Sequence, residues 1–170
     1  MAGSLEFIKS ATGSSVSSLD VTNCFSDTYD VYAFSVAKVV STGSGYINLR
    51  FLDSGGTVIT TSNYDYANHI LLDYSTFLEQ RETNNNAIDR IMRRDGTSAQ
   101  QSGGYHYIFN PYDSSSYTFY QGQAGGSIIT GSGLVGLKSI GVHKSAEQIS
   151  GFQLNASAAL TLEVSVYGVK

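Results

Sequence analysis

The sequence has little of what most functional classes depend on. Its one cysteine, Cys24, cannot close an intramolecular disulfide, which excludes a disulfide-stapled secreted miniprotein and favours a small buried apolar residue at this position. Only 14% of the residues are charged, against about 25% in ordinary soluble domains. The net charge of -4 has the wrong sign for a protein that binds DNA or RNA.

Long apolar runs are lacking as well. No stretch approaches the roughly 20 apolar residues of a membrane span, and the first residues have neither the basic nor the apolar region of a signal peptide. We therefore expect no membrane insertion and no export by that route. A length of 170 residues without an internal linker predicts a single domain, residues 1–170.

The chain is rich in hydroxyl and aromatic side chains, and its apolar and polar residues alternate with a period of two residues. Ser, Thr and Gly make up about a third of the residues, beside twelve Tyr and eight Phe. Apolar and polar residues alternate in short runs bounded by Gly, Asn, Asp or Ser, the pattern of half-buried strands. The runs predicted as strands are residues 5–9, 16–25, 29–40, 46–52, 57–61, 105–109, 117–121, 127–130, 134–142, 149–154 and 160–169.

Three segments have particular interpretations. Asp53-Ser54-Gly55-Gly56 predicts a tight hairpin turn, because paired glycines permit positive φ. Residues 122–126 are expected to be a flexible link, and residues 87–94 fit either a helical turn or a strand. The whole pattern predicts an all-β fold, an antiparallel β-sandwich or jelly roll of about nine or ten strands with little helix.

Motifs that carry chemistry are not found. His69, His106 and His143 are 37 residues apart, with no metal-ligand spacing around any of them. No serine lies in a Gly-x-Ser-x-Gly elbow, and no Gly-rich segment has the ending of a phosphate-binding loop. We therefore expect no enzyme, no metal and no cofactor. The one cluster of acids, interpreted as rim charges, is Asp65, Asp73, Glu79 and Glu82.

Two groups of residues are candidates for an interface. Arg90, Arg93 and Arg94, near Arg81, are the only basic concentration, and they form either a solvated edge or a contact with an acidic protein surface. Tyrosines supply rigid amphipathic contact area when they are not packed in the core. The tyrosine candidates are Tyr64, Tyr66, Tyr112 and Tyr117.

Several strand motifs, in their order along the chain, carry a family resemblance. They are residues 5–9 (LEFIK), 16–25 (VSSLDVTNCF), 29–32 (YDVY), 104–111 (GYHYIFNP) and 164–170 (VSVYGVK). In these motifs the chain resembles small β-sandwich virion proteins of tailed bacteriophages, notably those of marine and cyanobacterial phages. The resemblance implies a jelly-roll module on the virion, usually oligomeric and without catalysis, and it supplies no catalytic residues.

Two roles follow from the resemblance. The first is a capsid decoration, or cement, protein that contacts the major capsid protein or another virion protein as a homo-oligomer, a trimer being favoured. Residues 1–10, with Leu5, Phe7 and Ile8, are then either an ordinary first strand or an adhesive arm. The alternative is a tail fibre or spike tip that recognises a host glycan through loops at one end of the sandwich, residues 41–45, 64–68 and 112–117.

Overall fold

The part of the protein that the structure describes is built from strands. The computed structural model describes residues 4–41, 43–93, 101–127 and 133–170, and these residues form ten strands and no helix, which confirms the all-β prediction. Within these ranges, no helix is long and apolar enough to cross a membrane. The strands are β1 (Leu5–Val21), β2 (Val31–Ser41), β3 (Tyr46–Asp53), β4 (Tyr64–Leu72), β5 (Leu78–Asn85), β6 (Ile88–Arg93), β7 (Ser102–Phe109), β8 (Thr118–Ser127), β9 (Leu134–His143) and β10 (Ile149–Val169).

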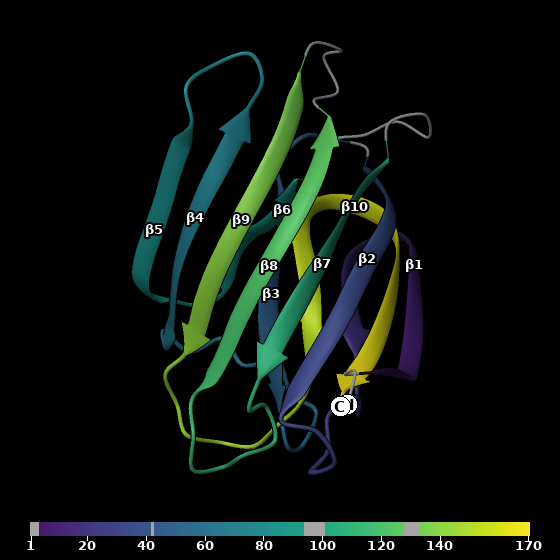
Figure 1. Ribbon diagram of the computed structural model, residues 1–170, viewed down its shortest axis with the longest axis vertical. Helices are drawn as coiled ribbons and strands as arrows, with labels where there is room; N and C mark the ends of the chain where they lie inside the picture. The colour runs from purple at the N-terminus through teal and green to yellow at the C-terminus, as the bar shows by residue number, and fades with distance from the viewer. Residues whose placement is uncertain (1–3, 42, 94–100, 128–132) are drawn as a thin grey trace.

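All ten strands belong to one antiparallel sheet. Its order is β5-β4-β9-β8-β7-β2-β10-β3-β6, and β1 pairs with β10 beside this path. The sheet curls until β6, at one end of the path, packs against β8 and β9 in the middle of it (Figure 1). The architecture is therefore a nearly closed barrel, where the sequence pattern predicts two separate packed sheets.

The sheet is continuous because β10 is a single strand of 21 residues. Its first part, from Ile149 to Asn155, pairs with β3, and its last part, from Leu160 to Gly168, pairs with β2. The sequence pattern predicts two strands here, residues 149–154 and 160–169. The small residues between them, 156–159, let one strand bend from the back layer to the front layer instead (Figure 1).

The first strand is merged in the same way. β1 covers the first predicted strand (residues 5–9), the polar run after it and residues 16–21 of the second predicted strand (16–25), and it pairs with β10 over its whole length. Register shifts between Phe7 and Lys9, and on both sides of Val16, absorb its curvature. Such shifts bend a strand without ending it. Of the two interpretations left open for residues 87–94, the strand is confirmed for the part that the structure describes.

The core lies between the layers of the curled sheet. Strands β2, β3 and β10 supply most of it, since successive side chains of a strand point to opposite faces. Burial of each large apolar side chain contributes roughly 1.5–3 kcal/mol. Cys24 joins this core as predicted, and burial raises the pKa of its thiol to about 12. The largest contributors include Phe34, Leu49, Phe51, Phe152, Leu154, Val164 and Val166.

The predicted hairpin after β3 is confirmed at its turn and shortened beyond it. The Asp53 carboxylate accepts hydrogen bonds from the amides of Gly55 and Thr57, at 2.9 and 2.8 Å, and Gly56 has a φ of 82°. Only glycine adopts this φ without strain. Past the turn, the predicted strand 57–61 is reduced to one bridge, between Leu52 and Val58.

Candidate functional site

The N-terminal candidates lie on the open edge of the molecule. Leu5 and Phe7 are each 59% exposed, whereas Ile8 is half-buried and packs against the core. The Phe7 ring meets the Tyr167 ring edge-on, with the centroids 5.8 Å apart. The face that carries Leu5 and Phe7 is therefore ordered and apolar at the surface.

This end of β1 is held in place by the end of the chain. Glu6 forms an ion pair with Lys170, and the backbone amide of Lys170 donates to the Ser4 carbonyl at 3.1 Å. The bond from Lys170 lowers the pKa of the Glu6 carboxyl. Because Leu5 is in register with Val169, the start of β1 is paired with the end of β10.

The two exposed edges of the sheet differ in charge. β1 pairs with β10 alone, so its other side presents unpaired backbone groups, and it carries three charged residues in 17. β5, at the end of the path, carries three in eight, Glu79, Arg81 and Glu82. Charges along an edge strand oppose pairing with other chains. β5 is protected in this way and β1 is not.

The basic candidates are anchored to one ring. The guanidinium carbons of Arg90 and Arg93 lie 4.9 and 5.0 Å from the centroid of Tyr46. This is the range of a cation–π contact, worth roughly 0.5–1 kcal/mol at an exposed site. Arg94 lies outside the described residues. Arg90 also has a φ of 59°, and its amide donates to the Asn48 side chain at 3.0 Å.

The tyrosine candidates divide between core and surface. Tyr64 is fully buried and Tyr66 is 7% exposed, so both are core residues and present no surface for an interface. Tyr112 is half-buried against the core, and Tyr117 is 46% exposed. Of the four, Tyr117 offers the most surface.

The loops expected together at one end of the molecule are separated. β2 and β7 are antiparallel, with Val31 opposite Phe109 and Val39 opposite Ser102. The loop at 41–45 therefore follows the end of the sheet where β7 begins, and the loop at 112–117 follows the end where β7 finishes. Residues 64–68 lie within β4, not in a loop. These three segments therefore do not lie together at one end of the molecule.

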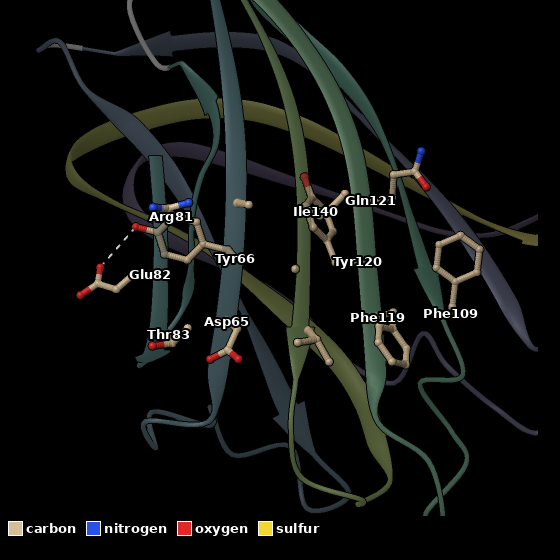
Figure 2. Close-up of a pocket in the computed structure, with 13 residues that line it drawn as sticks. Asp65, Tyr66, Arg81, Glu82, Thr83, Phe109, Phe119, Tyr120, Gln121 and Ile140 are labelled. Atoms are coloured by element: carbon tan, nitrogen blue, oxygen red, sulfur yellow. Dashed lines mark hydrogen bonds between the residues drawn. The ribbon is translucent and has the colours of Figure 1, made fainter. Parts of the chain in front are cut away.

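A groove does form on the outer face of the sheet. It holds about 850 Å³ and crosses β7, β8, β9, β4 and β5, as Figure 2 shows. Phe109 and Phe119 line one side of it, Ile140 lies in the middle, and Arg81 lies on the far strand. Sequence analysis missed this site. The signal available was the alternation in β8, whose outward residues are Phe119, Gln121 and Gln123.

The acids of the groove already have partners. Asp65 forms an ion pair with Lys144 at 2.8 Å, and the hydrogen bond from Lys144 lowers the pKa of this carboxyl. Glu82 accepts from the Tyr66 hydroxyl at 3.3 Å, and burial is the main cause that raises the pKa of Tyr66 to about 12. Arg81 has no hydrogen-bond or ion-pair partner among the described residues. Lys138, which lies near Arg81 on β9, likewise has no such partner among the described residues.

The other members of the predicted acid cluster are dispersed. Asp73 accepts from the Leu134 amide at 2.7 Å, at the opposite end of β4 from Asp65. Glu79 pairs in register with His69. Within the described ranges, no group of three His, Cys, Asp or Glu side chains could hold a metal ion.

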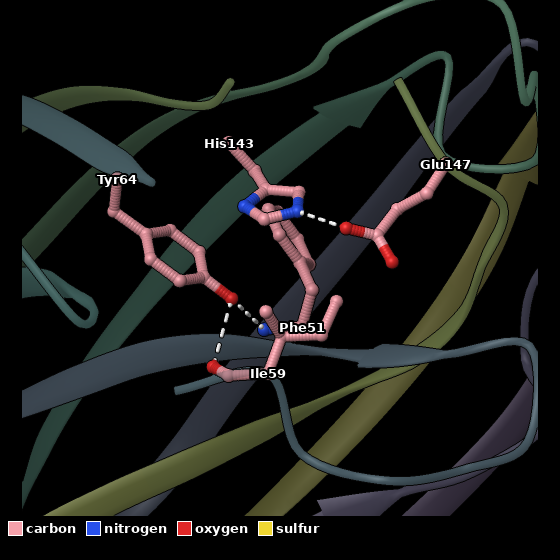
Figure 3. A network of polar contacts seen from close by, with 5 residues as sticks. All are labelled: Phe51, Ile59, Tyr64, His143 and Glu147. Atoms are coloured by element: carbon pink, nitrogen blue, oxygen red, sulfur yellow. Dashed lines mark hydrogen bonds and ion pairs between the residues drawn. The ribbon is translucent and has the colours of Figure 1, made fainter. Parts of the chain in front are cut away.

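Two histidines lie in the interior. His106 is fully buried, stacks on Phe34 with the centroids 4.6 Å apart, and its Nδ1 lies 2.8 Å from the Tyr120 hydroxyl. His143 lies against Tyr64, and its Nε2 lies 2.9 Å from Glu147 Oε1 (Figure 3). Both are integrated into the core, away from the outer groove.

Comparison with known proteins adds no relative. Neither the protein-family models nor the curated proteins contain a match to this chain.

Proposed function

We propose that this chain is a non-enzymatic virion structural protein of a tailed bacteriophage, a jelly-roll-like capsid decoration module that docks through the open edge of β1. The observation that carries the docking role is an unpaired, weakly charged edge with exposed Leu5 and Phe7 at its start. The virion assignment is supported by the sequence resemblance described above.

The geometry of this edge favours association with a second chain. Extended edges bind a partner strand through backbone hydrogen bonds, while alternate side chains fill pockets on the partner. The ion pair between Glu6 and Lys170 holds the edge in its extended form. Association then costs little ordering entropy, which raises affinity for a given contact area.

The partner we propose is the major capsid protein or a second virion protein, with the decoration module itself a homo-oligomer, a trimer being favoured. A standard interface buries roughly 800 Å² on each partner. Leu5, Phe7 and the half-buried Ile8 give such an interface an apolar centre, and backbone groups of β1 give it direction.

The test is binding to undecorated heads of the phage that encodes the chain. We expect saturable, stoichiometric binding, measured by sedimentation of the heads with labelled protein. Phe7→Lys places a charge on the edge without disturbing the core and is expected to weaken binding by at least about tenfold, or 1.4 kcal/mol.

Leu78→Lys is the matched control, because Leu78 is also exposed, at 47%, and starts the other edge strand. It is expected to bind heads like the unmodified protein. Two results contradict the proposal: the protein does not bind heads, or Phe7→Lys and Leu78→Lys weaken binding to heads equally. Binding to host cells in place of heads supports the fibre-tip role instead.

A further inference from the structure

The outer groove combines an apolar side with a polar side. Tyr105, Tyr107 and Phe109 point outward from β7, and the rings of Tyr107 and Phe109 are near-parallel, with centroids 6.4 Å apart. Next to them, Phe119 on β8 is 46% exposed. Flat aromatic rings of this kind bind ligands that have an apolar face.

Amides lie beside these rings. Gln121 and Gln123 point outward from β8, and within the described ranges neither side chain has a hydrogen-bond partner. A glutamine amide can donate two hydrogen bonds and accept two. Gln121 is in register with both Tyr107 and Ile140, so the amide lies between an aromatic strand and the floor of the groove (Figure 2).

The far side of the groove carries the Arg81 guanidinium. Arg81 is in register with Ala67 on β4, and Ala67 is in register with Ile140 on β9. Three strand spacings therefore separate Arg81 from β8, roughly 14 Å at 4.8 Å per spacing. A ligand that reaches from the Phe119 ring to Arg81 must be extended.

We infer that this groove binds an acidic oligosaccharide, with sugar rings against Phe119 and Phe109 and a carboxylate on Arg81. A pyranose ring has an apolar face of C–H groups and an edge of hydroxyls, which match the aromatic rings and the Gln121 amide. Arg binds a carboxylate through two parallel hydrogen bonds. The groove volume of about 850 Å³ lies within the roughly 300–1,000 Å³ of small-ligand sites.

Charge complementarity selects this ligand over other occupants. Asp65 is paired with Lys144. Glu82 keeps its charge but is in register with the inward-pointing Tyr66, whereas Arg81 is in register with Ala67, so Arg81 and the nearby Lys138 are cations that a ligand meets on the outer face. Arg81 and Lys138, in a chain of net charge -4, give no track for a polyphosphate backbone. The inference concerns a different face from the β1 edge and does not rest on the proposed docking role.

The experiment screens the intact protein against an array of acidic glycans, each printed beside its carboxyl-reduced neutral counterpart. Uronic-acid tetrasaccharides in the array are then titrated by calorimetry. We expect binding to at least one acidic glycan, weaker by about tenfold or more for its neutral counterpart. Arg81→Gln is expected to remove this preference and leave the residual binding to the neutral form.

The aromatic contact has a matched pair of variants. Phe119→Ala is expected to weaken binding of both forms, whereas Tyr117→Ala, at the same 46% exposure but outside the groove lining, is expected to change neither. Lys38→Gln controls for loss of an exposed cation on another strand. Unchanged thermal unfolding of each variant confirms that it is folded.

Three outcomes would overturn the inference. They are no binding to any acidic glycan of the array, equal binding of each acidic and neutral pair, and Phe119→Ala behaving like Tyr117→Ala. Concentration-dependent self-association that Phe119→Ala abolishes, measured by sedimentation, would assign the groove to a second copy of the chain.

Discussion

The hydroxyl of Tyr64 bridges two buried backbone groups, the Phe51 amide and the Ile59 carbonyl. It accepts a hydrogen bond from the Phe51 amide at 3.0 Å and donates one to the Ile59 carbonyl at 3.2 Å (Figure 3). One step nearer the turn, the Ile59 amide bonds directly to the Phe51 carbonyl at 2.9 Å. The inserted hydroxyl ends the ladder, which explains why the predicted strand at 57–61 is not completed.

Replacing this hydroxyl tests its contribution. Tyr64→Phe leaves the Phe51 amide and the Ile59 carbonyl buried without a partner, which costs roughly 1–3 kcal/mol. We expect the free energy of unfolding in urea to fall by that amount. Tyr117→Phe removes an exposed hydroxyl and should stay within about 0.5 kcal/mol of the unmodified protein. Equal effects of the two changes would show that the bridge is not stabilising.

The sequence does not show which individual tyrosines are buried and which are exposed. Composition correctly indicates that they divide between core and surface, yet Tyr64 and Tyr117 look alike as residues in alternating runs. What separates them is the partner that each hydroxyl meets after folding. Tyr64 meets backbone groups 13 and 5 residues away, an arrangement fixed by the turn at Asp53 and not by its own neighbours.

Among the strands, β8 shows how an element can depend on glycine. Residues 122–126 read as a flexible link, but all of them lie within β8. The Tyr120 side chain crosses Gly122 to reach His106, and a Cβ on Gly122 would collide with His106 Nδ1 and the Tyr120 hydroxyl. The glycine leaves room for two rings on the inner face of a regular strand.

Gly122→Ala should therefore destabilise the fold by roughly 1–3 kcal/mol, the usual cost of overpacking a core. Gly125→Ala, on the outer face of the same strand, meets no atom closer than 4.0 Å and should be neutral or stabilising by up to about 1 kcal/mol. Thermal unfolding of the two variants measures the difference. A stable Gly122→Ala protein would contradict this account of β8.

The alternation of apolar and polar residues predicts where strands occur, but it does not predict how long each strand is. Residues 105–109 and 134–142 become β7 and β9 nearly as expected, because each run alternates and ends at a turn residue. β1 and β10 each join two predicted strands across a stretch of small residues, where side chains give no signal. Pairing with each other along their whole length keeps both extended.

At the scale of the whole molecule, the outer groove is a feature that no single strand forms. The groove depends on the register that aligns Tyr107, Gln121, Ile140, Ala67 and Arg81 across five strands. These residues lie between positions 67 and 140 of the sequence, and their alignment follows from long-range pairing. The alternation at residues 105–109 predicts a strand there but gives no means to place its aromatic side chains across the sheet from Arg81.

Closing the sheet also buries His106, and this makes the stability of the whole molecule depend on pH. Burial lowers the pKa of His106 to about 3, from an ordinary value of 6.5. Its neighbours are Phe34, Tyr120 and glycines 104 and 122, so no charged group faces it among its recorded contacts. In the unfolded chain the imidazole takes up a proton below about pH 6.5, whereas in the native protein it stays neutral down to about pH 3.

The unfolded state thus binds more protons than the native state between these two values. Stability should fall as pH falls from about 6.5 toward 3, at up to roughly 1.4 kcal/mol per pH unit from this residue. Urea unfolding at several pH values between 6.5 and 4 measures how the free energy of unfolding changes with pH. His106→Phe keeps a ring against Phe34 and should lower this slope by the equivalent of one bound proton, roughly 1.4 kcal/mol per pH unit. NMR titration of the unmodified protein gives an independent check that needs no variant. A His106 imidazole signal that shifts with a midpoint near pH 6.5 would contradict the prediction, because a histidine that charges freely in the native state contributes no such slope.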